Sequence, residues 1–358
     1  MRLLFALPGF HRVERGAEVA LLAVARALSA LGEDVTIAGS GKPRAGTPYR
    51  YFQVPCVRRE RLEWAPRFPP FRSETAWEDA TFAAALLAKF TPQAFDATLT
   101  CSFPFTHWAL RRPARAAPRH VFVTQNGDWP ARSSKSEYRF FNCDGVVCTN
   151  PDYFEANRQR WNCALIPNGV DLERFSPGKA ERSQFGLPDD KPVILMVSAL
   201  IESKRVLDGI RMVSGLDNAH LVVAGDGPLR GPVQALADEL LPGRFTRLSV
   251  AADRMPGLYR SADAFLHMSL TESFGNVYLE AWACGLPIVA HDSASLRWIL
   301  GDGQFLCDTT TSEETVTRLR QALERGKQPP DGTIERFTWP EVGRRYQAFL
   351  REIVGRSA

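Results

Sequence analysis

Short apolar runs alternate with helical patterns along most of this 358-residue chain. Such an alternation is typical of βαβ units, in which a helix connects each strand to a parallel neighbour and covers one face of the sheet. The predicted strands of the first half are residues 2–7, 35–38, 97–101, 120–124 and 145–149. Those of the second half are residues 192–198, 221–225, 264–267, 287–290 and 304–306. The sequence therefore predicts an α/β fold with two parallel sheets.

Proline and glycine residues near the midpoint separate these two series of units. The segment 166–171 reads IPNGVD, and Pro177-Gly178 follows it, a composition typical of an interdomain connection. At roughly 100–200 residues per domain, the length also favours two domains. We predict an N-terminal domain at 1–166, a linker at 167–191 and a C-terminal domain at 192–338. Ligands of doubly wound domains bind outside the carboxyl ends of the strands, so we expect the site there.

Composition and charge exclude several classes of protein. Hydrophobic residues make up 45% and charged residues 23% of the chain, which excludes a disordered or collagen-like protein. The formal charge of +4, from 44 Lys+Arg and 40 Asp+Glu, is too small to indicate a nucleic-acid-binding protein. The seven cysteines form no C-x-x-C pair and the chain has no D-x-D sequence. We therefore expect reduced thiols and no metal site.

No segment has the pattern of a targeting sequence or a membrane span. The apolar N-terminal run ends at Pro8 and is too short for the core of a signal peptide. The longest apolar stretch, residues 17–31, contains Glu18 and Arg26, which a membrane-spanning helix rarely carries. We therefore expect a cytoplasmic protein.

The segment with the most chemical information is 272–287, ESFGNVYLEAWACGLP. Glu272 and Glu280 stand eight positions apart on either side of a glycine turn. On one continuous helix their side chains would lie roughly 80° apart, but a helix that begins near Asn276 would let both carboxylates approach one pocket. A carboxylate suits the vicinal diol of a sugar or a ribose. A phosphate would be favoured at the helix N-terminus, near the backbone amides of Phe274, Gly275 and Asn276. The alternative is a solvated Glu280 and a helix-capping Glu272.

This segment resembles the donor-site motif of the retaining glycosyltransferases of family 4, E-[GS]-F-G…L-E-A-x-A-x-G-x-P. Further segments resemble the same family in the expected order: Gly16-Ala17-Glu18, IPNGVDLERF at 166–175, AGDGP at 224–228, and 255–263. The resemblance implies the GT-B fold, with two Rossmann-like doubly wound domains that face a central cleft. It also implies that a final helix, 339–358, completes the N-terminal domain. Thr338-x-x-Glu341 is a capping box at the start of that helix.

The resemblance implies roles for individual residues. Glu280 would bind the ribose hydroxyls of the nucleotide, and Glu272 would lie beside the donor sugar. Lys204 matches the basic residue that holds the diphosphate, where its charge would offset that of the leaving group. The alternative for Lys204 is an exposed residue in the first turn of a helix. Gly16 would let the backbone approach the diphosphate closely, or it is a plain loop glycine.

Three positions depart from the family pattern. Ala199 stands where an arginine is usual, and we expect Arg205, adjacent to Lys204, to supply the missing cation. Asn126 takes the place of a histidine near the donor sugar, and an amide can donate a hydrogen bond but cannot act as an acid or base. Arg15 replaces the first glycine of the usual pair. These three departures affect the expected contacts with the donor sugar and the acceptor, but not the expected class of enzyme.

Candidate acceptor-binding residues lie in the N-terminal half: Glu18, Asp128 and Trp129. Asp128 could orient an acceptor hydroxyl or stabilise its own turn, and Trp129 could stack on a sugar or belong to the core. His107 and His120 could face the cleft, but isolated histidines are more often packed or surface residues, and that is what we expect of them. The resemblance implies no metal and no cofactor, since the nucleotide sugar is a substrate.

These observations together predict a retaining glycosyltransferase. It would move a hexose from a nucleotide diphosphate sugar to a hydroxyl of a saccharide, a glycolipid or a lipid-linked acceptor. Paired carboxylates also serve glycoside hydrolases, but in the family that the chain resembles they position the donor. Two alternatives stay open: a nucleotide-sugar epimerase of the same fold, and a catalytically silent subunit that binds sugar nucleotides, given Ala199 and Asn126.

The small net charge hides an uneven distribution. Residues 1–180 and 339–358 together carry 28 Lys+Arg and 19 Asp+Glu, or +9, whereas residues 181–338 carry 16 and 21, or −5. A solvated surface is one explanation. The other is attraction of the N-terminal domain to a phosphate-bearing acceptor or to an anionic membrane, which would place the protein at the inner membrane face.

Overall fold

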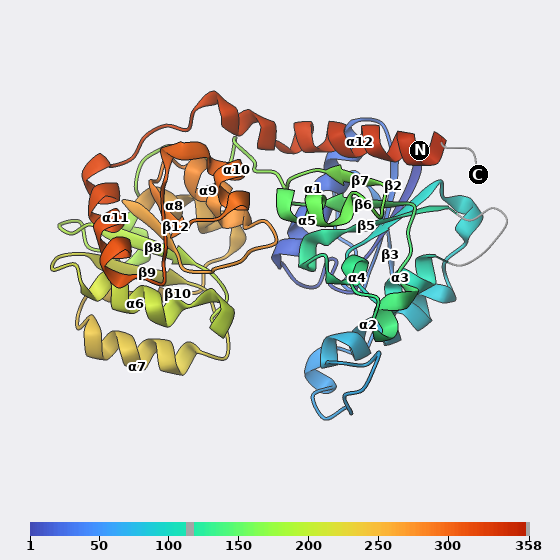
Figure 1. The fold of residues 1–358 in the computed structure, drawn as a ribbon, viewed down its shortest axis with the longest axis horizontal. Helices are drawn as coiled ribbons and strands as arrows, with labels where there is room; N and C mark the ends of the chain where they lie inside the picture. Colours follow the sequence, from blue (N-terminus) through green and yellow to red (C-terminus); the bar gives the residue numbers. More distant parts are fainter. Residues whose placement is uncertain (112–117, 356–358) are drawn as a thin grey trace. The chain divides into compact units, whose positions relative to one another are not determined.

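The computed structural model describes residues 1–111 and 118–355, which form two compact units (Figure 1). The N-terminal unit comprises Met1–Gly169 and Phe337–Ala358, and the C-terminal unit comprises Val170–Arg336. We expected a linker at 167–191, but from Val170 onward this segment packs as part of the C-terminal unit. There the ring of Phe175 meets that of Tyr259 edge-on, with centroids 5.9 Å apart, and Arg182 forms an ion pair with Asp263 at 2.5 Å.

Within residues 1–111 and 118–169, the N-terminal unit has a seven-stranded parallel sheet in the order β3-β2-β1-β4-β5-β6-β7. Its strands are β1 (Arg2–Ala6), β2 (Asp34–Gly39), β3 (Arg50–Gln53), β4 (Ala97–Thr100), β5 (Arg119–Val123), β6 (Gly145–Cys148) and β7 (Cys163–Leu165). The five strands that apolar runs predicted are confirmed as β1, β2, β4, β5 and β6. The sequence reading missed β3 and β7, because these short edge strands are only partly buried and the apolar runs at them are short.

Helices cover both faces of this sheet. They are α1 (Gly16–Ala30), α2 (Glu74–Leu87), α3 (Phe105–Leu110), α4 (Trp129–Arg132), α5 (Pro151–Asn157) and α12 (Trp339–Gly355). Successive side chains of a strand point to opposite faces. Accordingly, Leu3 and Phe5 of β1 pack in one core with α1 and α12, whereas Leu4 and Ala6 pack in a second core with α2. The N-terminal unit is thus a three-layer α/β structure.

The last helix, α12, packs against the first, α1 (Figure 1). Gly343 makes this close approach possible, because a Cβ atom there would lie 2.7 Å from the Cβ of Ala27. Val342, Tyr346 and Leu350 of α12 are buried in the same core as β1. The end of the chain therefore belongs to the N-terminal unit.

The described residues of the C-terminal unit form a six-stranded parallel sheet in the order β10-β9-β8-β11-β12-β13. Its strands are β8 (Val193–Val197), β9 (His220–Ala224), β10 (Phe245–Leu248), β11 (Ala264–His267), β12 (Ile288–His291) and β13 (Phe305–Cys307). Its helices are α6 (Val206–Ser214), α7 (Arg230–Leu240), α8 (Met255–Ser261), α9 (Asn276–Ala283), α10 (Ala294–Leu300) and α11 (Ser312–Arg325). This is the doubly wound order, in which the chain reverses direction across the sheet between β8 and β11. The α/β fold with two Rossmann-like units is confirmed.

Short 3-10 segments connect these elements. They are η1 (Arg59–Arg61), η2 (Pro92–Ala94), η3 (Thr124–Asn126), η4 (Ser136–Phe140), η5 (Arg182–Phe185), η6 (Glu202–Lys204), η7 (Ala252–Arg254), η8 (Gly301–Gly303) and η9 (Gly332–Phe337). All seven cysteines are free thiols. Across the described helices, none is long and apolar enough to span a membrane.

Candidate functional site

The candidate site lies in the C-terminal unit at the carboxyl ends of β8 and β11, the neighbouring strands at which the sheet order reverses. Two glycines let the loop after β8 pack closely on the loop after β9. A Cβ atom at Gly225 would lie 1.8 Å from the carbonyl oxygen of Ser198, and one at Gly227 would lie 2.5 Å from that of Leu200. The amide of Leu200 donates to the carbonyl of Asp226 at 3.0 Å. This packing fixes the loop that leads into η6 and Lys204.

Lys204 and Glu272 meet in an ion pair between the loop after β8 and the loop after β11. Their side chains are 23% and 19% exposed, so both charges are partly shielded and still accessible to a ligand. The ammonium and the carboxylate come from positions 68 residues apart in the chain. The structure therefore brings together two of the residues that the sequence predicted, at the crevice where this fold binds ligands.

Gly275 makes the turn that separates the two glutamates. Its φ of +83° lies in the left-handed region, and a Cβ atom there would lie 2.5 Å from the ring of Tyr278, so only glycine fits. Helix α9 begins at Asn276 directly after this turn, as we expected. Glu272 consequently lies in a loop while Glu280 lies in the helix.

Glu280 has a partner of its own. Its Oε2 accepts a hydrogen bond from the hydroxyl of Tyr259 at 2.8 Å. Burial raises the pKa of Glu280 above its ordinary value, and the bond from Tyr259 partly opposes that effect. The alternative of a fully solvated Glu280 is wrong, because this carboxyl group is half-buried and held in place.

His267, the last residue of β11, is a component of the site that the sequence reading missed. It is buried, its Nδ1 lies 3.0 Å from the hydroxyl of Tyr278, and its Nε2 lies 3.7 Å from Oε1 of Glu272. Burial lowers the pKa of His267 to about 4, so the imidazole is neutral near pH 7. A signal was available: a polar residue at the carboxyl end of a predicted strand, five positions before Glu272.

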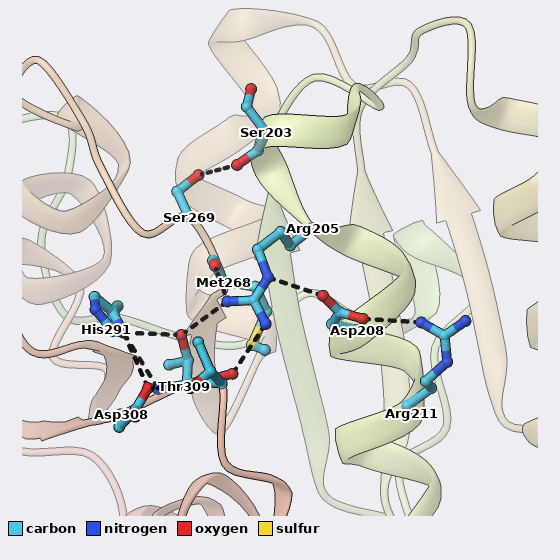
Figure 2. Close-up of polar contacts among 10 residues, drawn as sticks. Ser203, Arg205, Asp208, Arg211, Met268, Ser269, His291, Asp308 and Thr309 are labelled. Carbon is cyan, nitrogen blue, oxygen red and sulfur yellow. Dashed lines mark hydrogen bonds and ion pairs between the residues drawn. The ribbon is translucent and has the colours of Figure 1, made fainter.

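Arg205 does not have the role that we expected. Its Nε donates to Asp208 at 2.8 Å, Nη1 donates to the carbonyl of Met268 at 3.3 Å, and Nη2 donates to the carbonyl of Thr309 at 3.2 Å (Figure 2). These bonds tie the start of α6 to the ends of β11 and β13. They assign Arg205 a structural role, in place of the diphosphate-binding role that we expected it to take over from an arginine at position 199.

In the N-terminal unit, Gly16 and Glu18 lie at the start of α1. Gly16 is the first residue of this helix, and a Cβ atom there would meet no described atom within 4 Å. Glu18 is only 7% exposed, and its carboxyl group lies under Gly9, where a Cβ atom would come within 1.9 Å of Oε1. Burial raises the pKa of Glu18. The carboxyl group of Glu18 is therefore buried inside the loop, whereas Gly16 is exposed and its backbone is accessible.

The other N-terminal candidates differ in accessibility. Asn126, at the end of η3, is exposed, and its Nδ2 lies 3.6 Å from the Sγ of Cys101. Trp129 is 45% exposed. Asp128 is buried and accepts a hydrogen bond from Nδ2 of Asn157 at 2.9 Å, which favours its turn-stabilising role. Asn126 and Trp129 are thus accessible on the surface of this unit.

His107 and His120 are packed, as we expected. Nε2 of His120 lies 3.0 Å from Nδ1 of His107, and Nδ1 of His120 lies 2.8 Å from the hydroxyl of Thr98. Burial lowers the pKa of both imidazoles, that of His120 to about 3. In residues 1–111 and 118–355, no group of three or more His, Cys, Asp or Glu side chains could hold a metal ion.

Comparisons with known proteins place this geometry in a family. The chain matches the model of "Glycosyltransferase Family 4" over residues 15–174 and that of "Glycosyl transferases group 1" over residues 178–332. It is 31% identical over 186 residues to the lipopolysaccharide core biosynthesis glycosyltransferase LpsE of Rhizobium meliloti. That match covers 51% of this chain and 53% of the relative, so the chain spans about half the length of this curated relative.

Solved structures share the whole fold. The sucrose-phosphate synthase of Thermosynechococcus elongatus has a TM-score of 0.72 at 18% identity, over 99% of this chain and 96% of its own. Anabaena HepE, solved in complex with UDP-glucose, has a TM-score of 0.68 at 18% identity, over 99% of this chain and 97% of its own. Identities this low show the fold alone. The two family models, adjacent along the chain and each matching one half, show that this protein belongs to the GT-B glycosyltransferases of the family 4 and group 1 type.

Proposed function

We propose that this protein transfers a hexose from a nucleotide diphosphate sugar to a hydroxyl group of a saccharide, glycolipid or lipid-linked acceptor, with retention of the anomeric configuration. The observation that carries the proposal is the ion pair of Lys204 with Glu272 at the carboxyl ends of β8 and β11. This pair places a cation and a hydrogen-bond acceptor side by side. A sugar diphosphate needs both, the cation for its phosphates and the acceptor for a sugar hydroxyl.

Lys204 is the group that we assign to the diphosphate. In the transfer step the bond from C1 of the sugar to the diphosphate oxygen breaks, and its electron pair stays on that oxygen. The acceptor oxygen bonds to C1 from the same face, and its proton moves to the departing phosphate oxygen. The ammonium of Lys204 offsets the charge that develops there. We propose that the reaction is metal-independent, because this protein cation supplies the compensating charge.

The two glutamates would bind different parts of the donor. Glu272 would accept a hydrogen bond from a hydroxyl of the hexose. Tyr259 holds one oxygen of Glu280, and the second oxygen is the atom that we assign to the ribose. HepE is a structural neighbour solved with UDP-glucose, which supports a sugar nucleotide of this class as the donor of this chain.

The N-terminal unit is the one that we assign to the acceptor, because Asn126 and Trp129 are exposed there. It also has a basic and aromatic pocket of ≈ 650 Å³, lined by Trp108, Arg111, Arg139, Phe140, Phe141 and Asn142. Trp108 also lines an adjoining apolar pocket of ≈ 350 Å³ beside α2 and α3. Two arginines beside an apolar groove suit a phosphate attached to a lipid. We therefore propose a peripheral contact with an anionic membrane on the cytoplasmic side.

A donor screen tests the enzymatic proposal. The purified chain is incubated with UDP-glucose, UDP-galactose, UDP-N-acetylglucosamine and GDP-mannose, and the released nucleotide diphosphate is measured with and without a pool of acceptors. We expect slow donor hydrolysis that Glu272→Gln and Lys204→Ala reduce. Isomerised donor without acceptor would instead indicate an epimerase. Nucleotide binding without turnover in any acceptor pool would indicate a silent subunit.

Vesicles test the membrane contact. We expect the chain to bind phosphatidylglycerol vesicles more strongly than phosphatidylcholine vesicles, and binding to weaken with salt because the attraction is screened. The double variant Arg111→Glu, Arg139→Glu should reduce this binding while donor hydrolysis stays unchanged. Salt-insensitive or absent binding would contradict the contact.

A further inference from the structure

His267 lies beside Tyr278 and Glu272, and the proposed function gives it no role. It ends β11, and it lies between the hydroxyl of Tyr278, 3.0 Å from Nδ1, and the carboxylate of Glu272, 3.7 Å from Nε2. The turn at Gly275 packs over this group, since a Cβ atom there would lie 2.5 Å from the ring of Tyr278 and 3.7 Å from Cγ of Glu272. The three side chains therefore form one compact cluster.

The positions of the protons in this cluster follow from hydrogen-bond accounting. Tyr278 is 2% exposed, and a buried hydroxyl donates its proton to an acceptor. The nitrogen within reach is Nδ1 of His267. Burial keeps the pKa of His267 low, at about 4, so the imidazole is neutral. A neutral imidazole carries a hydrogen on only one of its two ring nitrogens. With Tyr278 as the donor and Nδ1 as the acceptor, the ring hydrogen lies on Nε2, the nitrogen that faces Glu272.

The same carboxylate oxygen of Glu272 therefore meets one cation and one neutral hydrogen-bond donor. Oε1 pairs with the ammonium of Lys204 and faces the Nε2–H of His267. The distance of 3.7 Å to Nε2 exceeds a hydrogen bond, so this contact is a longer electrostatic one. In the proposed function Lys204 must also neutralise the diphosphate, and an ammonium shared with that group holds Glu272 less firmly. His267 has no such second task.

We propose that His267 is a positioning residue, fixed as its Nε2–H tautomer by Tyr278, that keeps the carboxylate of Glu272 oriented toward the donor sugar while Lys204 holds the diphosphate. The inference rests on the proposed function, because it gives Glu272 a sugar hydroxyl to bind. It adds a specific requirement. Tyr278, which does not touch the donor, sets the tautomer of His267, and this tautomer orients the carboxylate that binds the donor sugar.

The tautomer can be observed directly. A long-range proton–nitrogen spectrum of the histidine-labelled protein, with His267 assigned from the His267→Gln spectrum, should show the neutral Nε2–H form from pH 5 to pH 8. Tyr278→Phe should convert the signal to a mixture of tautomers. A neutral Nδ1–H form in the unmodified protein would overturn the proposal.

Kinetics then test the function of the tautomer. His267→Leu should lower kcat for donor hydrolysis about tenfold, while the Kd for the nucleotide diphosphate without sugar stays within about twofold. His267→Gln should preserve most activity, because an amide can accept from Tyr278 and donate to Glu272 at once. Tyr278→Phe should lower kcat in the presence of His267 but have no further effect in the His267→Leu chain, since leucine has no polar group for Tyr278 to orient.

A matched control is His220→Gln. His220 is also a buried histidine of this sheet, but it lies at the amino end of β9 and contacts Thr246 at 2.8 Å, so donor hydrolysis should not change. A merely structural role for His267 would lower nucleotide binding and turnover together, and that result would overturn the inference. An unchanged turnover in Glu272→Gln would instead remove the role of Glu272 in the proposed function, whatever the tautomer of His267.

Discussion

The two units use their polar side chains in different ways, although both are doubly wound α/β structures. In the C-terminal unit, Lys204, Glu272 and His267 meet at the carboxyl ends of two neighbouring strands. In the N-terminal unit, Asp128 accepts a hydrogen bond from Asn157, and the carboxyl group of Glu18 is buried against the backbone of Gly9. These two carboxyl groups stabilise the fold and do not meet in a common site. A shared fold thus predicts where a site can form, but not which polar residues take part in it.

The charge distribution sharpens this contrast. The residues of the N-terminal unit carry 26 Lys+Arg and 17 Asp+Glu, or +9, and those of the C-terminal unit carry 18 and 23, or −5. We assign the anionic donor to the C-terminal unit, whose net charge is negative. Local cations such as Lys204 must therefore attract it, because net charge does not. In the N-terminal unit, the overall field itself favours an anionic partner.

The largest expected effect is that of Lys204→Ala, which removes the cation from the donor crevice. Loss of a charge that stabilises a leaving diphosphate should lower kcat/KM for donor turnover on the order of 100- to 1,000-fold, measured as released nucleotide diphosphate. Lys204→Arg should retain part of the activity. Arg211→Ala, which removes an exposed charge on α6, is the control and should leave turnover unchanged. Equal losses in both variants would show that the site does not depend on Lys204 specifically.

Glu272→Gln should have the next largest effect. We expect kcat for donor turnover to fall roughly 10- to 100-fold, while the affinity for the nucleotide diphosphate alone stays constant or rises, because Lys204 loses its competing carboxylate. Calorimetric titration with UDP and GDP measures this affinity. Glu202→Gln, an exposed substitution in η6, is the matched control. Weaker diphosphate binding in Glu272→Gln would contradict the assignment of Glu272 to the sugar.

Asp128→Ala should act on stability rather than on chemistry. Asn157 would lose one of the two acceptors of its amide group, keeping the carbonyl of Tyr153, so the free energy of unfolding should fall by about 1–3 kcal/mol, measured by urea denaturation. Turnover per folded molecule should not change. Glu155→Ala, which removes an exposed ion pair on the same helix as Asn157, should cost less than about 0.5 kcal/mol. An Asp128→Ala protein that is stable but inactive would show that the N-terminal unit has a catalytic carboxylate after all.

Acid should destabilise the core of the N-terminal unit through His120. Burial lowers its pKa to about 3 in the folded state, against about 6.5 for an ordinary histidine. Since the unfolded chain binds the proton first, this group's contribution to stability is present above pH 6.5 and is lost as the pH falls toward 3. The loss is about 1 kcal/mol per pH unit. Hydrogen exchange of β5 between pH 6 and pH 4 measures it, and His120→Gln should flatten the dependence.

Local patterns in the sequence predicted much of both sheets. Buried strands such as β1 and β9 are continuous apolar runs, because helices cover both faces of a parallel sheet. The edge strands β3 and β7 are partly buried, and their apolar runs are too short to stand out. Within the site, the position of Gly275 in the chain was enough to predict the turn at which α9 begins. The conformation of that turn is a property of a few neighbouring residues, which is why sequence reasoning reached it.

The role of Arg205 could not be predicted in the same way. Its partners Met268 and Thr309 lie 63 and 104 positions away in the chain, and they adjoin Arg205 only because β8, β11 and β13 belong to one sheet. The same applies to His267, whose importance depends on the positions of Tyr278 and Glu272 around it. Adjacency in the sequence suggested that Arg205 would act with Lys204, but the geometry separates their roles.

The sequence by itself determined the family, the two parallel sheets and the motif that places Glu272 and Glu280 around a glycine turn. These properties depend on periodicity and on residues close together in the chain. Only the tertiary structure decided which charges meet, which carboxyl groups are buried and which arginine is structural. The reason is physical: hydrogen bonds, ion pairs and desolvation act over a few ångströms in space, and the fold alone brings distant positions within that range.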